Sequence, residues 1–249
     1  MRVSGPRSGR TPCSLTRASM TQQATPTDAL SSISGSTLAY LFANRFVPTE
    51  GPGRSGMKAF GTGEVVVTKE LSAGLVAIAL WQLREQGAVT LEAYREKRLG
   101  LISVSGVRVR VVGALPARGV EKRVLDHLQS SRRAREGRET AFDVANLICR
   151  DGNDPRGTVI RYAIDDAVEL GYLDRIKQDA GVAGRLAGKS TTLEPHADRI
   201  AALATTAQTL AERWRAFRTD EEPLAKLLRS TTYDGIESRV RDRSDSGPD

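Results

Sequence analysis

Cysteine, histidine and aromatic side chains are scarce in this sequence. The chain of 249 residues has 2 cysteines and 2 histidines, and its aromatic fraction is 5%. Cys13 and Cys149 lie far apart and Cys13 falls in a predicted tail, so we expect no structural disulfide. Because two cysteines and two histidines give no metal-ligand spacing, we also expect no metal site.

Long apolar runs are missing as well. A membrane-spanning helix needs about 18 apolar residues in succession. The longest run, 71–83, is shorter and contains Ser72 and Gln82. The first residues carry arginines but no apolar core, which argues against a secretory signal. We therefore expect a cytoplasmic protein without a transmembrane segment.

The residue patterns that support catalysis are absent too. His127 and His196 have no partner in the sequence that would complete a catalytic triad, and Asp165 and Asp166 diverge by about 100° on a helix. In the glycine-rich stretch 181–192, three residues separate the glycines where a phosphate-binding loop needs four. We predict a protein that is not an enzyme and that binds no cofactor.

Two stretches, 71–92 and 157–176, share one plan. Each has an apolar helix, then a glycine (Gly87 or Gly171), then a β-prone run. A glycine just past a helix end fits the left-handed conformation that ends many helices. Winged-helix domains pass from their third helix into the wing in this way, so the pattern favours two winged-helix-like units.

The fold prediction is an α+β protein that is mostly helical. Its length allows one large domain or two small ones. We expect five segments: 1–34, a disordered basic tail in which Met20 is an alternative start to Met1; 35–113, the first winged-helix-like unit; 114–192, the second unit; 193–230, a C-terminal amphipathic heptad helix; and 231–249, a disordered tail.

The first unit contains a helix, 71–86, that is apolar nearly all the way round and should be buried with Trp81 in the core. Farther on, Ser105-Gly106 is predicted to be a two-residue turn between two short strands. On the second of these strands Arg108 and Arg110 should share the face opposite to the valines.

Arginines form the main candidate site. The formal net charge is +7, and the connector 130–139 holds the densest basic group. A basic surface favours anionic partners, either lipid headgroups or nucleic acid, but ordinary solvation of exposed charge is an alternative. The candidate anion-binding residues are Arg108, Arg110, Arg132, Arg133, Arg135 and Arg138.

The second central helix is a poor candidate for reading DNA. Its expected outward positions, Arg161, Asp165, Asp166 and Glu169, are net acidic, whereas a recognition helix presents donors and cations to the groove. Binding of nucleic acid would therefore depend on the arginines, and it would be sensitive to salt.

Residues 197–217 carry an apolar stripe with heptad spacing, which includes Leu203, Leu210, Trp214 and Phe217. Such a stripe has two interpretations, a homodimer seam or a helix packed along the domain. Pro223 is expected to interrupt this helix.

Three segments give the chain a resemblance to a known family. They are GLVAIALWQLREQGAVTLE (74–92), VRVRVVGALPARGVEKRVLDHL (107–128) and VIRYAIDDAVELGYLDRI (159–176). Their order and apolar pattern resemble the bacterial Golgi phosphoprotein 3-like proteins, peripheral membrane proteins that bind phosphoinositides. The resemblance implies association with an anionic membrane surface. It carries over no binding residue, because the basic headgroup pocket of the family has no counterpart in this sequence.

Three functions follow from these patterns. The first is a non-catalytic binding or adaptor protein, associated peripherally with an anionic, phosphoinositide-type membrane surface. The second is a winged-helix protein that binds nucleic acid, of the transcriptional-regulator type. The third is a protein–protein assembly module that uses the helix at 197–217.

Overall fold

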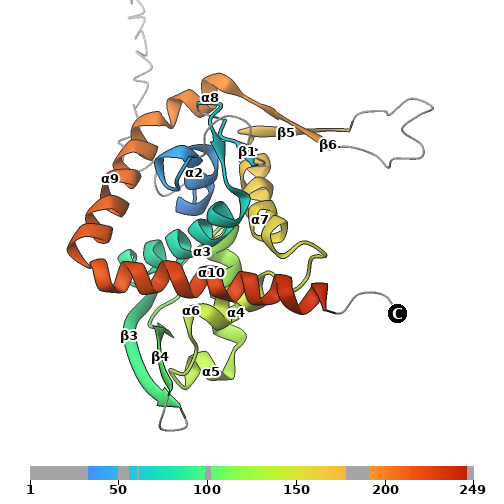
Figure 1. The fold of residues 1–249 in the computed structure, drawn as a ribbon. Helices are drawn as coiled ribbons and strands as arrows, with labels where there is room; N and C mark the ends of the chain where they lie inside the picture. The colour runs from blue at the N-terminus through green and yellow to red at the C-terminus, as the bar shows by residue number, and fades with distance from the viewer. Residues whose placement is uncertain (1–32, 50–55, 61, 99–101, 178–190, 246–249) are drawn as a thin grey trace, which may run out of the picture.

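A buried helix lies at the centre of the fold (Figure 1). The computed structural model describes residues 33–49, 56–60, 62–98, 102–177 and 191–245. The central helix, α3 (Thr68–Glu85), packs against the helices around it, among them α2 (Gly35–Leu41), α4 (Gly119–Ser130), α6 (Ala141–Ile148), α7 (Pro155–Glu169) and α10 (Glu222–Ser244). Every residue from Leu71 to Leu83 is buried, because this helix has no polar face to turn toward water. Its predicted burial is confirmed.

The other elements surround this helix. They are η1 (Ala43–Arg45), β1 (Met57–Lys58), β2 (Val65–Val66), β3 (Val89–Arg98), β4 (Ile102–Val111), α5 (Arg132–Arg135), β5 (Leu173–Lys177), β6 (Thr191–Pro195), α8 (Ala197–Ala202) and α9 (Ala204–Asp220). The strands pair only as antiparallel two-stranded sheets within the described residues. The protein is therefore mostly helical with small sheets, as the α+β prediction requires.

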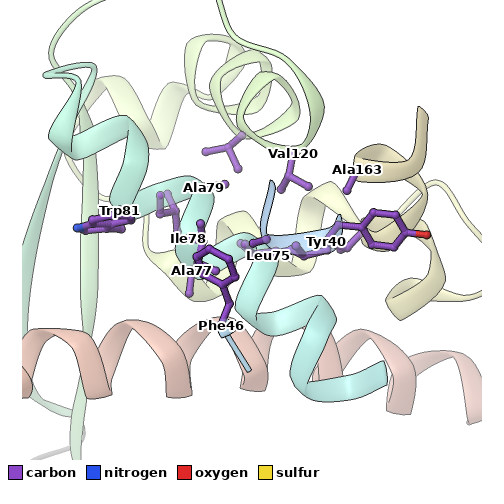
Figure 2. Close-up of a cluster of buried hydrophobic side chains, with 14 of the residues drawn as sticks. Tyr40, Phe46, Leu75, Ala77, Ile78, Ala79, Trp81, Val120 and Ala163 are labelled. Carbon is purple, nitrogen blue, oxygen red and sulfur yellow. The ribbon is translucent and has the colours of Figure 1, made fainter. Parts of the chain in front are cut away.

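The apolar core is one continuous cluster that reaches from Ile33 to Ile236. Figure 2 shows its centre, where Tyr40 and Val120 approach α3 from different elements and Leu75 and Trp81 extend from α3 itself. The side chain of Trp81 is 1% exposed, which confirms its predicted place in the core. Because both predicted units contribute to the same cluster, neither has a core of its own.

The helix–glycine–strand plan occurs twice, as the sequence predicts. Gly87 ends α3 with φ of 74°, and Gly171 ends α7 with φ of 71°. In each case the next residue bonds back into the last turn, with 2.9 Å from Ala88 N to Leu83 O and 2.8 Å from Tyr172 N to Ala167 O. Each helix then leads into an antiparallel hairpin, β3–β4 after α3 and β5–β6 after α7.

The predicted turn at Ser105-Gly106 is wrong. Both residues lie inside β4, where Ser105 pairs with Arg95 and Gly106 pairs with Tyr94. The glycine makes room for an aromatic ring, because a Cβ atom at position 106 would lie 2.9 Å from the Tyr94 hydroxyl. The predicted faces of the strand are right, since Val107 and Val109 are buried and Arg108 and Arg110 are exposed.

The predicted disordered tail at 231–249 is also wrong for residues 231–244, which continue α10. Pro223 lies at the start of this helix, where a missing N–H is tolerated, so it begins a helix and does not interrupt one. Thr232 is fully buried, and its hydroxyl donates to Leu228 O at 3.0 Å. Gly235 lets α10 approach α6 closely, because a Cβ atom there would lie 2.5 Å from Phe142 O.

The predicted N-terminal tail ends slightly earlier than expected. Ile33 is 4% exposed, and Ser34 caps α2 by accepting a bond from Thr37 N. The rest of that tail, with Cys13 and Met20, lies outside the described residues, as does most of the glycine-rich stretch 181–192. Among the helices that the structure describes, none combines the length and apolar character needed to cross a membrane.

Candidate functional site

The structure brings the two predicted groups of arginines together. Backbone contacts join β4 to the connector that follows α5: Val109 N donates to Glu139 O at 2.9 Å, and Arg108 forms a β-bridge with Thr140. In Figure 1, α5 accordingly lies beside the β3–β4 hairpin. We call the resulting group of exposed side chains the arginine surface; it comprises Arg108, Arg110, Arg132, Arg133, Arg135 and Arg138.

Carboxylates neutralise part of the arginine surface. Arg108 pairs with Glu96, and Arg133 Nη2 lies 3.2 Å from Asp143 Oδ2. Arg132 and Arg138 both reach Glu136, at 2.8 Å and 3.6 Å. Within the described ranges no ion pair forms at the other two members of the surface, Arg110 and Arg135.

A buried carboxylate holds α5 against α4. Glu139 is 1% exposed, and it accepts a 2.6 Å bond from Ser131 Oγ and lies 3.3 Å from His127 Nε2. Burial alone would raise the pKa of Glu139, but the bonds from His127 and Ser131 hold it below its ordinary value. The carboxylate lies between the serine and the histidine, so this trio has a structural role and is not arranged as a catalytic triad.

The heptad stripe faces the interior of the monomer. Leu203, Leu210, Trp214 and Phe217 are all buried, and each is at most 7% exposed. Trp214 packs on Trp81 of α3 with 5.3 Å between ring centroids. A helix packed along the domain therefore accounts for the stripe. Because these side chains are buried within the monomer, they do not support the homodimer predicted through 197–217.

A buried polar cluster lies between α2, α4 and α7, and the sequence analysis missed it. Asp166 was expected to face outward, but its side chain is 2% exposed. It accepts bonds from Thr37 Oγ1 at 2.6 Å, Ser34 Oγ at 3.1 Å and Arg118 Nε at 2.8 Å. The bond with Asp166 raises the pKa of Arg118, so Arg118 stays charged.

Glu121 is the second carboxyl group of the cluster. It is 3% exposed and accepts a 2.8 Å bond from Ser36 N and another bond from Ser36 Oγ. Burial is the main cause that raises the pKa of Glu121 to about 7, and the nearby Asp166 adds to the shift. The bonds from Ser36 oppose this shift. Arg118 is engaged by Asp166 and Glu169, so Glu121 forms no ion pair within the described part of the chain.

Two cavities adjoin this cluster, and Arg118 lines both of them. The larger has a volume of about 480 Å³ and is lined by side chains of both signs, among them Lys122, Arg123 and Asp165. The smaller has a volume of about 290 Å³ and a more apolar wall, with Ile33, Leu115, Pro116, Gln82, Arg118 and Glu121 among its lining residues.

A sequence signal for this cluster exists in the helical spacing. Glu121 stands four residues before Leu125 and seven before Leu128, which are both buried. Asp166 stands three residues after the buried Ala163. A carboxylate on an apolar stripe predicts a buried, bonded group, and the hydroxyl-rich run Ser34 to Thr37 supplies the partners.

Among the residues that the structure describes, no three His, Cys, Asp or Glu side chains converge in a way that could hold an ion. His196 lies 2.9 Å from Asp174, and this pair is exposed.

Comparisons with family models, with curated proteins and with solved structures find no match for this chain. The resemblance to Golgi phosphoprotein 3-like proteins therefore stays a prediction.

Proposed function

We propose that this chain is a non-catalytic binding protein, cytoplasmic and attached peripherally to anionic membrane surfaces through the arginine surface. The observation that carries the proposal is the assembly of β4 and α5 into one exposed basic face. Residues 88–111 and 130–143 together contain nine Lys and Arg against five Asp and Glu, so the face keeps a positive excess after its own ion pairs.

An exposed apolar side chain near this face favours lipid over nucleic acid. Val112 follows β4, two residues beyond Arg110, and is 62% exposed. A basic surface with an apolar neighbour suits the boundary between headgroups and acyl chains.

The repeated helix–glycine–hairpin unit supports the prediction of winged-helix-like units. We interpret 35–113 and 114–192 as two winged-helix-like units that share α3 as a common core. The resemblance to Golgi phosphoprotein 3-like proteins agrees with a lipid headgroup as the ligand.

Co-sedimentation with vesicles tests this function. Phosphatidylcholine vesicles with and without phosphatidylserine or a phosphoinositide would be compared, at low salt and at about 0.15 M salt, with duplex DNA as competitor. We expect pelleting with the anionic vesicles only. Since each arginine near such a surface contributes about 1 kcal/mol, the double variant Arg132→Gln, Arg135→Gln should bind about 30-fold more weakly.

The matched control is Arg215→Gln, Arg218→Gln, which removes the same charge from the exposed face of α9. Equal losses in both variants would contradict a localised surface and indicate a general effect of net charge. Pelleting that DNA abolishes would assign the surface to nucleic acid. No pelleting with any vesicle would refute the membrane proposal.

A further inference from the structure

The smaller cavity beside Arg118 contains a polar atom without a partner. Gln82 on α3 is 6% exposed, and its Oε1 atom accepts no hydrogen bond within the described structure. The amide lies against Gly35, where a Cβ atom would come within 2.4 Å of Oε1. Both residues line the cavity, so the glycine leaves space for an unsatisfied acceptor at its wall. A buried polar group of this kind normally has a partner.

Glu121 adds a second acceptor to the same wall. Its known bonds come from Ser36, which leaves lone pairs on a carboxyl group that forms no ion pair within the described residues. Arg118 also lines the cavity, and its ion pairs are with other carboxylates: its Nε bonds to Asp166 and its Nη2 to Glu169, each at 2.8 Å. The Gln82 Oε1 atom and the Glu121 carboxyl therefore give this part of the wall two acceptors.

The rest of the wall is apolar. Ile33, Leu115 and Pro116 line it, and the volume of about 290 Å³ is at the lower end of small-molecule sites, which begin at about 300 Å³. A ligand for this space needs a compact apolar body and one polar head that donates hydrogen bonds.

We propose that this cavity binds a small organic amine. The ammonium group donates to the Glu121 carboxylate and to Gln82 Oε1, and the apolar body contacts Ile33, Leu115 and Pro116. This site is separate from the arginine surface and does not depend on the proposed membrane function.

Binding of an amine at this site should depend on pH. The groups that face Glu121 are Ser36 from α2, Gln82 from α3, Asp166 from α7 and Arg118 at the start of α4. Because burial raises the pKa of Glu121 to about 7, its carboxyl is largely neutral below that pH. An ammonium ligand then has to displace a proton, so its affinity should fall about tenfold from about pH 8 to about pH 6.

Benzylamine is a suitable probe, with benzyl alcohol as its neutral isostere. Each would be titrated into the full-length protein and followed by amide chemical shifts at about pH 6 and about pH 8. We expect saturable shifts around Gln82 and Glu121 with benzylamine, tighter binding at the higher pH, and weaker binding of benzyl alcohol.

Glu121→Gln should remove both the pH dependence and the preference for the amine. Glu212→Gln is the matched control, because Glu212 is an exposed glutamate of α9 that does not line this cavity. A second variant, Gln82→Leu, should weaken binding of the amine and keep its pH dependence.

Three results would overturn the proposal. They are equal affinity for benzyl alcohol and benzylamine, an unchanged pH profile in Glu121→Gln, and no saturable shift with benzylamine. If Glu121→Gln does not fold, unchanged affinity in Gln82→Leu would serve as the refuting result.

Discussion

Glu121→Gln gives a direct test of the buried polar cluster through the pH dependence of stability. The pKa of Glu121 is about 7 in the folded protein, against 4.5 for an ordinary glutamate. Between these values the folded state holds one proton that the unfolded state has lost. Stability therefore falls as pH rises through this window, by about 1.4 kcal/mol per pH unit, and levels off above pH 7.

The expected size of the effect follows from the same values. A window of about 2.5 pH units corresponds to about 3 kcal/mol, as an order of magnitude. Glutamine is neutral and can still accept the bond from Ser36 N, so the variant should lack this fall. From about pH 5 to about pH 8, the parent should therefore lose about 3 kcal/mol of unfolding free energy relative to the variant.

Urea unfolding at several pH values and constant ionic strength measures this difference. The titratable groups other than Glu121 are present in both proteins, so their contribution cancels. Glu169→Gln should show no such trend, because the Glu169 side chain is 72% exposed. A difference for Glu121→Gln that does not change with pH would refute a buried carboxyl with a raised pKa.

Two further predictions concern packing and backbone conformation. Trp214→Ala should destabilise the protein by about 3–5 kcal/mol and leave its mass in light scattering unchanged, because the ring packs on Trp81 within the monomer. Loss of a dimer with unchanged thermal stability would support the homodimer seam instead. Gly87→Ala should lower the free energy of unfolding in urea by about 1–2 kcal/mol, because the backbone φ of 74° disfavours a residue with a side chain. No steric clash adds to this loss, since no neighbour lies within 4 Å of the added Cβ atom. Gly87→Asn should cost less, and equal stability of all three proteins would contradict the reasoning.

The sequence predicted those elements correctly whose local residue pattern alone determines their conformation and burial. Residues 71–86 are apolar on all sides, so no arrangement could leave them in water, and Gly87 and Gly171 mark helix ends through their backbone freedom alone. In these cases the deciding interaction lies within a few residues of the position itself.

Prediction failed where a distant partner decides the environment of a residue. The sequence around Gly106 predicts a turn, but in the structure Gly106 lies within a strand and the Tyr94 side chain of the neighbouring strand packs over it. Thr232 and its neighbours resemble a polar tail, yet contact with α3 and α6 buries that face of α10. Asp166 was assigned to the outside on its charge, and the hydroxyl partner that permits its burial, Thr37, lies 129 residues away.

The arginine surface and the smaller cavity depend on opposite ends of one helix. Glu121 in the first turn of α4 lines the cavity, and His127 near the end of α4 bonds to Glu139, which holds the connector after α5. Six residues of α-helix separate the two side chains by about 9 Å along the axis. The charges that would bind lipid, led by Arg132 and Arg135, share no bond with Glu121 or Gln82 in the described structure. Loss of vesicle binding in an arginine variant should therefore leave amine binding intact, and failure of either proposal leaves the other standing.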